Sequence, residues 1–338
     1  MSLYLGVDAG GTRSTALVVD GSGVLRGRAD GRAANYQNIG AAAAREVLRQ
    51  LVAEALTAAQ ATPRDLSHAC YGIAGADRPK DFAAIEHQLP AVPAAVPRSL
   101  VNDTMLVLRA GTPDGVGMAL VSGTGTNALG RDARGKVARV GGFCPELGDF
   151  GSAPDLGREA LRLAMRGHDG RGRPTRLYED LCATLGVDPL EDVIDAWMSG
   201  DPRANDFGSF APLVFAAAAQ GDVVARDLLT RAGSELALCV RVLAQELFAG
   251  GEPFTVVLGG SVLQRGADPT VLHTLAAELA QTHPRARVVR LAVEPAVGAV
   301  LLASDLDRSR SAGQQAELAA GLAAAFGPSF AEPVAVDP

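Results

Sequence analysis

Apolar residues recur with two different periods along the chain, and the change of period predicts where strands and helices lie. Short, apolar, β-prone runs separated by Gly- and Asp-rich turns predict three strands joined as hairpins, over 3–7, 14–19 and 24–29. Apolar positions at helical spacing over 40–60 predict the first long helix. Further strands are predicted at 68–73 and 98–102, and further helices over 80–89 and 104–110.

The same pattern then returns. A strand at 117–121, a Gly-rich turn at 122–126 and two more strands, at 127–130 and 136–140, repeat the order of the first segment. Such self-similarity predicts an internally duplicated α/β protein.

The rest of the chain is predicted to be mostly helical over 155–250, with strands at 255–258 and 288–291 and a helix over 296–303. Beyond Asp305 the composition becomes rich in Ala, Gly and Gln and then in Pro, so we expect a weakly attached helix and a frayed tail over 306–338.

Composition narrows the class of protein. Hydrophobic residues make up 48% of the chain and charged residues 20%, enough for a sizeable core. The net charge of −7 disfavours nucleic acid and anionic lipid as partners, and no apolar run approaches the ~20 residues of a membrane helix. The four cysteines, which are widely spaced, form no CxxC pair, so we expect reduced thiols in a cytoplasmic protein; they are Cys70, Cys144, Cys182 and Cys239.

Two Gly-rich turns follow predicted strands, at Asp8–Thr12 and Ser122–Asn127. Adjacent glycines let backbone N–H groups approach an anion closely, because no Cβ intrudes. The Thr12 hydroxyl can donate to a phosphoryl oxygen, and Asp8 can hold a hydrated divalent cation. Each turn alone is equally compatible with an ordinary tight hairpin, but two such turns facing each other could clamp a polyphosphate.

Asn102-Asp103 stands at the carboxyl end of a predicted strand, where ligands of α/β proteins usually bind. Asp103 could accept the proton of a hydroxyl that attacks phosphorus. The alternative is that Asp103 is the N-cap of the helix that follows.

Three further patterns have structural alternatives. The turn at Gly259-Gly260 could lie against an adenosine, and the small residues of Pro295–Ala299 permit close helix packing and a hinge-like contact between domains. In both segments the alternative is that the glycines serve ordinary packing alone. The match to GxxxxGK from Gly130 to Lys136 lies between two predicted strands, with Val137 in place of Ser or Thr. Because a phosphate-binding Walker loop must open a helix, we interpret this match as a hairpin loop.

Five segments, strand–DAGGT, strand–NDT, strand–SGTGTN, strand–LGGS and PAVGA, occur in that order. They resemble the phosphate 1, connect 1, phosphate 2, adenosine and connect 2 segments of the actin/hexokinase superfamily. Ala34-Asn35, the run Gly141–Ser152 and Ala219–Asp222 are similar to the N-acetylglucosamine kinase group, which is related to the BadF/BadG/BcrA/BcrD ATPases. The resemblance covers residues 3–305.

This resemblance implies two duplicated ribonuclease H-like (actin-like ATPase) domains with a cleft between them. The small domain would span 1–116, completed by the helix 295–305, and the large domain 117–294, followed by the tail 306–338. The implied protein is a homodimeric kinase that uses ATP and Mg²⁺ and phosphorylates the 6-hydroxyl of N-acetylglucosamine or glucosamine.

The resemblance also assigns roles to individual residues. Asp103 would be the catalytic base, and Asp8 would hold the metal. The nucleotide would be contacted by Asp8, Gly10, Gly11, Thr12, Gly123, Thr124, Gly125, Gly259, Gly260 and Gln264. The sugar would be contacted by Asn35, Asp103, Thr126, Asn127, Gly142, Phe143, Cys144 and Asp149.

Two departures from the family pattern fall in the implied sugar pocket. The chain has GDFGS where the family often has GDEGS, and Gly142-Phe143-Cys144 where the family has a Trp-bearing GWG. The sugar therefore stays open between glucosamine, N-acetylglucosamine and another hexose derivative. The rival interpretation is an ATPase that activates a partner enzyme, which would need cluster-binding cysteines that this spacing does not supply.

Overall fold

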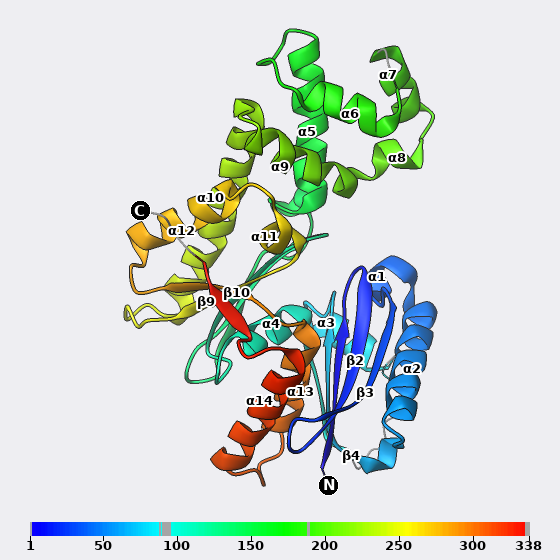
Figure 1. Ribbon diagram of the computed structural model, residues 1–338, viewed down its shortest axis with the longest axis vertical. Helices are drawn as coiled ribbons and strands as arrows, with labels where there is room; N and C mark the ends of the chain where they lie inside the picture. The colour runs from blue at the N-terminus through cyan, green and yellow to red at the C-terminus, as the bar shows by residue number, and fades with distance from the viewer. Residues whose placement is uncertain (1, 88, 90–95, 188–189, 335–338) are drawn as a thin grey trace.

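The chain folds into two halves, each built on one mixed β-sheet (Figure 1). The computed structural model describes residues 2–87, 89, 96–187 and 190–334. The first sheet has the strand order β3-β2-β1-β4-β5, with β1 (Leu3–Ala9), β2 (Arg13–Asp20), β3 (Leu25–Arg32), β4 (Leu66–Ile73) and β5 (Arg98–Asn102). The second has the order β11-β10-β9-β6-β7-β8, with β6 (Gly117–Ser122), β7 (Thr126–Arg131), β8 (Val137–Val140), β9 (Thr255–Gly259), β10 (Arg287–Leu291) and β11 (Ala331–Pro333).

The two sheets share one topology, which confirms the predicted duplication and the α/β class. In each, the first three strands form an antiparallel meander, β1–β2–β3 in the first half and β6–β7–β8 in the second. The next strand then pairs in parallel with the first, β4 with β1 and β9 with β6. The parallel strands place their carboxyl ends at one edge of each sheet, where the Gly-rich turns begin.

Helices cover the sheets. Those of the first half are α1 (Tyr36–Ile39), α2 (Ala41–Ala58), η1 (Pro63–Asp65), α3 (Pro79–Glu86) and α4 (Asp103–Gly111). Those inserted before β9 are η2 (Pro145–Leu147), α5 (Ala153–His168), α6 (Leu177–Leu185), α7 (Leu190–Met198), α8 (Pro202–Asn205), η3 (Phe207–Phe210), α9 (Ala211–Ala219) and α10 (Val223–Leu247). The remainder are α11 (Ser261–Arg265), α12 (Thr270–Thr282), α13 (Pro295–Asp305) and α14 (Ala312–Phe326).

The layers follow from the apolar pattern. Helix α2 buries Leu48, Leu51, Val52 and Ala55 against the first sheet, and these are the positions whose spacing predicted the helix. Helices α5 to α9 form a cap at the far end of the second half (Figure 1). Within the described part of the chain no single helix is long and apolar enough to cross a membrane; one pair bent by 115°, 207–219 with 223–247, passes by length and composition alone.

Helices α4 and α13 form a core cluster with strands of both sheets, and glycines let the backbones touch. A Cβ on Gly6 of β1 would lie 2.5 Å from the backbone nitrogen of Val300 in α13, and one on Gly298 would overlap the carbonyl of Leu106 in α4. The small residues of Pro295–Ala299 therefore serve close helix packing, as predicted, and the hinge-like contact stays a prediction.

The expected C-terminal helix is present as α14, but it is packed against the core and not weakly attached, and the chain after it, expected to be a frayed tail, forms the strand β11. Helix α14 buries Leu318 and Leu322 completely, and β11 pairs with β10 as an edge strand of the second sheet. Gly321 of α14 lies directly on Ser22 and Gly23 of the first half. The i, i+4 pair of leucines is the signal that the Ala-rich composition concealed. Residues 335–338 lie outside the described part.

The GxxxxGK match is a hairpin loop between β7 and β8, as predicted. Asp132 Oδ1 accepts hydrogen bonds from the backbone nitrogens of Arg134 and Lys136, which closes the loop. The Lys136 ammonium lies 3.1 Å from Glu246 on α10, and both side chains are about half exposed. No helix begins at this lysine, so the geometry of a phosphate-binding loop is absent from it.

Replacing Lys136 by Ala is therefore expected to leave ATP affinity within about twofold, because an exposed ion pair contributes little. Calorimetric titration with ATP measures this, with Arg134→Ala in the same loop as the matched control. A loss of about a hundredfold, roughly 2.7 kcal/mol, would contradict the hairpin interpretation.

Candidate active site

The Gly-rich turns of the two halves lie against each other. A Cβ on Gly11, after β1, would be 3.4 Å from Thr124 Oγ1 in the turn after β6. A Cβ on Gly123 would be 3.5 Å from the backbone nitrogen of Ser261, at the start of α11. The structure thus brings together three turns that are far apart in the sequence.

The backbone of these turns is held locally, which leaves the exposed threonines available. Gly10 N donates to Arg13 O at 3.0 Å, and Gly123 N donates to Gly125 O at 2.9 Å. Thr12 and Thr124 are exposed. The two turns therefore present hydroxyl groups and small residues on facing surfaces.

The third turn depends on Gly260. Its φ is +85°, a region that favours glycine, and a Cβ there would overlap the carbonyl of Ser122. Gly259 ends β9, where a Cβ would meet Val107 at 3.2 Å. Gln264 on α11 donates through Nε2 to Leu291 O at 3.1 Å, so its amide nitrogen holds α11 to the end of β10.

Asp103 is the first residue of α4, and it does not cap that helix. The N-cap is Asn102, whose Oδ1 accepts a hydrogen bond from Thr104 N at 2.9 Å. The alternative interpretation of Asp103 as the cap is therefore wrong, because its neighbour performs that role. The Asp103 carboxylate, half-buried, is therefore not needed as the cap of α4.

Two aspartates in this region hold their protons unusually well. Burial, and then the negative charge of Asp77, raise the pKa of Asp103 to about 6, against backbone N–H groups that lower it. Burial, and then the charge of Asp103, raise the pKa of Asp8 to about 8; Glu294 adds to this rise and Arg13 opposes it. Carboxylates that repel one another in this way favour a bound cation.

The loop after β8 is fixed by Asp149. Its Oδ1 accepts from Gly142 N at 3.2 Å and its Oδ2 from Phe143 N at 2.6 Å. Gly141 and Gly142 have φ of +68° and +78°, which lets the loop fold onto this carboxylate. In the structure, the Asp149 carboxylate holds the loop, whereas the resemblance implied that it contacts the sugar.

The other residues assigned to the sugar lie on both sides of this loop. Phe143 is 55% exposed and Cys144 is half-buried. Thr126 pairs with Ser122 where β7 begins. Asn35, on the first half, caps α1 by accepting from Gln37 N at 2.9 Å, and lies beside Gly75.

Asn127 contributes an unusual group. Its Oδ1 is buried and has no hydrogen-bond partner among the described residues, whereas its Nδ2 donates to Asn102 Oδ1 at 3.1 Å. A Cβ on Gly142 would lie 2.6 Å from that oxygen, so glycine is required to leave it room. A buried acceptor without a donor is costly unless a ligand supplies one.

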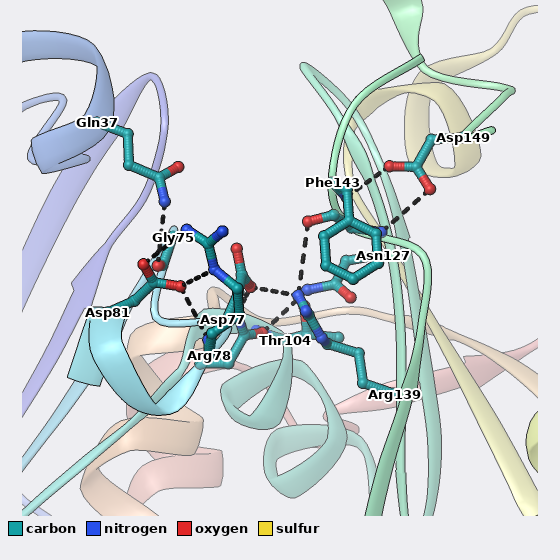
Figure 2. A network of polar contacts seen from close by, with 12 residues as sticks. Gln37, Gly75, Asp77, Arg78, Asp81, Thr104, Asn127, Arg139, Phe143 and Asp149 are labelled. Atoms are coloured by element: carbon teal, nitrogen blue, oxygen red, sulfur yellow. Dashed lines mark hydrogen bonds and ion pairs between the residues drawn. The ribbon is translucent and has the colours of Figure 1, made fainter. Parts of the chain in front are cut away.

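Sequence reasoning missed Asp77 and Arg139, which meet beside Asp103. Figure 2 shows Asp77, from the loop after β4, reaching Arg139 of β8; their oxygen and nitrogen are 2.5 Å apart. Asn102 Nδ2 also donates to Asp77 Oδ1, at 2.9 Å. The carboxyl-edge argument used for Asp103 applies equally to Asp77, which follows the predicted strand 68–73.

A cavity of about 440 Å³ adjoins this region at Asp149. Its lining, which is mostly charged, includes Glu146, Arg158, Glu159, Arg162, Arg231 and Glu235. Within the described residues no group of three or more His, Cys, Asp or Glu could hold a metal ion by itself.

Known proteins resemble this chain over most of its length. It is 27% identical over 315 residues to the N-acetyl-D-glucosamine kinase of Dictyostelium discoideum, covering 89% of this chain and 97% of the relative. It is 28% identical over 263 residues to the N-acetylmuramic acid/N-acetylglucosamine kinase of Clostridium acetobutylicum, covering 77% of this chain and 84% of that one.

The fold has solved counterparts. A candidate N-acetylglucosamine kinase from Chromobacterium violaceum superimposes with a TM-score of 0.71 at 24% identity, covering 89% of this chain and 99% of the other. A ROK family glucokinase from Streptomyces griseus, in complex with glucose and AMPPNP, gives a TM-score of 0.54 at 19% identity, covering 90% of this chain and all of the other. The family model of the BadF/BadG/BcrA/BcrD ATPases matches residues 5–303, and the chain belongs to that family.

Proposed function

We propose that the protein is an ATP-dependent amino-sugar kinase that transfers the γ-phosphate of ATP to the 6-hydroxyl of N-acetylglucosamine or glucosamine. The observation that carries this proposal is Asp103, a half-buried, non-capping carboxylate at a strand end, close enough to Asp8 before the first Gly-rich turn for its charge to raise the pKa of Asp8. The names of the relatives from Dictyostelium discoideum and Clostridium acetobutylicum support a sugar as the acceptor.

On the nucleotide side, the proposal places the phosphates between the turns at Gly10–Thr12 and Gly123–Gly125. Exposed hydroxyls of Thr12 and Thr124 and nearby backbone N–H groups are suited to phosphoryl oxygens. The adenosine would lie along Gly259, Gly260 and Gln264, where the chain cannot carry a Cβ at Gly260.

The carboxylates fit a magnesium ion. Burial and the negative charge of Asp103 raise the pKa of Asp8 to about 8, and a divalent cation beside Asp8 would stabilise its ionised form. Mg²⁺ usually takes only one or two protein carboxylates and completes its shell with water and phosphate oxygens, which agrees with a single acidic ligand at Asp8. When bound, the metal would neutralise charge on the phosphates.

On the sugar side, Asn127 supplies the strongest support. Its orphan Oδ1 could accept a hydrogen bond from a sugar hydroxyl, which would remove the cost of leaving it unpaired. Asn35, Thr126 and the loop Gly142–Cys144 with Asp149 would complete the pocket. Asp103 would orient the 6-hydroxyl and take its proton at a carboxylate oxygen as the new P–O bond forms.

We also propose how the chain divides into domains, how it assembles and where it is located. The small domain would be 1–116 with α13, and the large domain 117–294. A homodimer and a cytoplasmic location remain predictions; sedimentation and fractionation measurements would test them.

The function is tested by ADP release against a panel of hexoses and amino sugars. We expect N-acetylglucosamine or glucosamine to stimulate turnover, and the analogue that lacks the 6-hydroxyl to bind without being phosphorylated. Unstimulated ATP hydrolysis with every sugar would favour the alternative, an ATPase of this family that activates a partner enzyme. Against that alternative, Cys70 and Cys182 are buried, so they are not placed to hold an iron–sulfur cluster at a subunit interface.

The raised pKa of Asp103 gives a pH prediction. A base must be ionised to accept a proton, so kcat/KM for the sugar should fall as the pH is lowered through about 6, the pKa that burial and Asp77 impose. An ordinary aspartate, with a pKa of about 3.9, would keep activity well below that pH. A profile that stays flat down to pH 4.5 would contradict the assignment of Asp103.

A further inference from the structure

One ion pair connects the two halves of the molecule directly beside the proposed base. Arg139 Nη1, on β8 of the second sheet, lies 2.5 Å from Asp77 Oδ1, in the loop that follows β4 of the first. The two side chains are only 15% and 13% exposed. A pair this shielded is costly to break from one side, since the remaining charge loses its partner in a poorly solvated place.

Arg139 also holds the proposed sugar loop. Its strand leads directly into Gly141–Cys144, and its Nη1 approaches Gly142 O at 3.5 Å. Its guanidinium carbon lies 4.8 Å from the centre of the Phe143 ring, within the range of a cation–π contact. The same side chain therefore touches Asp77 of one half and the loop of the other (Figure 2).

Asp77 in turn reaches the strand end that carries the base. Asn102 Nδ2 donates to Asp77 Oδ1 at 2.9 Å, and Asn102 Oδ1 caps α4 by accepting from Thr104 N. The same Oδ1 accepts from Asn127 Nδ2 at 3.1 Å. Asn102 is thus held from both halves, and Asp103 is the residue that follows it.

We propose that Arg139 is a positioning residue for phosphoryl transfer: through Asp77 and Asn102 it sets the distance between the sugar loop and Asp103. This inference rests on the proposed function and deepens it. A sugar held by the loop must present its hydroxyl within hydrogen-bond reach of the base, and a misplacement of about 1 Å can cost about a hundredfold in rate. The nucleotide turns have no hydrogen bond or ion pair to Arg139 among the described contacts, so ATP binding should be independent of it.

The test compares Arg139→Gln, Asp77→Asn and the double variant. We expect each single change to lower kcat/KM for the sugar by about tenfold or more while KM for ATP stays within about twofold. Both remove the same link, so the double variant should be no worse than the worse single one. Arg139→Lys keeps a positive charge beside Asp77 but lacks the planar guanidinium over Phe143. It should therefore retain part of the kcat/KM for the sugar that Arg139→Gln loses.

A control separates positioning from stability. Arg109→Gln breaks another ion pair of α4, with Asp305, at the opposite end of the helix; the two side chains are 8% and 34% exposed, and the Nε–Oδ2 distance is 2.8 Å. It should lower the melting temperature and leave KM for the sugar unchanged. If Arg139→Gln does not fold, Asp77→Asn and Arg139→Lys decide the matter by the same measurements.

Three outcomes would overturn the inference: sugar kinetics of Arg139→Gln within twofold of the parent, effects of the two single changes that multiply in the double variant, or an equal loss in Arg109→Gln. These differ from failure of the proposed function, which would show as full activity in Asp103→Asn or as no response to any sugar. Normal Arg139→Gln together with inactive Asp103→Asn would reject the positioning role alone.

Discussion

Asp103→Asn is expected to lower kcat by at least about a hundredfold, the lower bound of what a general base usually contributes. A sugar hydroxyl is a poor nucleophile at neutral pH, so a carboxylate must orient it and accept its proton. Asparagine keeps the size and one acceptor oxygen of the side chain but loses its basicity. Steady-state phosphorylation assays at saturating ATP and sugar measure the change.

This substitution should affect the reaction without affecting the stability of the fold. Asn102 caps α4, so Asp103→Asn removes no capping bond, and the melting temperature should be close to that of the parent. ATP affinity should also be preserved, since Asp103 would face the sugar. Asp227→Asn, which breaks an exposed pair with Arg173, is the matched control and should keep normal activity. Near-normal kcat in Asp103→Asn would remove this residue from the reaction.

Gly260→Ala is expected to lower kcat/KM for ATP by about a hundredfold and to destabilise the fold by about 1–3 kcal/mol. The backbone at Gly260 has a φ of +85°, and the new Cβ would overlap the Ser122 carbonyl. The junction of β6 with its turn must then shift, and with it Gly123 and Thr124. ATP titrations and chemical denaturation measure the two effects.

The control for this variant is Gly221→Ala, between α9 and α10. Gly221 has a similar φ, +91°, but no atom lies within 4 Å of the position of its Cβ. Gly221→Ala should therefore lower the free energy of unfolding but leave kcat/KM for ATP unchanged. Gly260→Ala with kcat/KM for ATP within about twofold of the parent would show that this turn does not border the nucleotide.

The strands and glycine turns could be predicted from the sequence because their signals are local. A buried apolar run that ends in Asp-Ala-Gly-Gly-Thr or Leu-Gly-Gly-Ser specifies both a strand and a sharp exit from it. The strand β11 could not be predicted in this way. Its three residues, Ala331–Pro333, are too few to show an alternating pattern, and the strand forms only by pairing with β10.

The active-site network was only partly predictable for a related reason. Asn102 and Asp103 are both good N-caps by residue type, so the sequence cannot say which of them caps α4 and which is left free. The structure decides it through one hydrogen bond to Thr104. Arg139 and Asp77 are 62 residues apart, and nothing local in either segment marks the pairing.

The C-terminal segment has a mechanical consequence. Residues 326–331 lead from α14, which rests on Ser22 and Gly23 of the first half, to β11 in the second sheet. Together with the passages from α4 to β6 and from β10 to α13, this makes three connections between the halves in the described chain. Two domains joined by a single chain segment can rotate about any axis. Domains joined by three separate segments can rotate only about an axis that passes close to all three. Any rotation of one half against the other is therefore limited by the path of the chain.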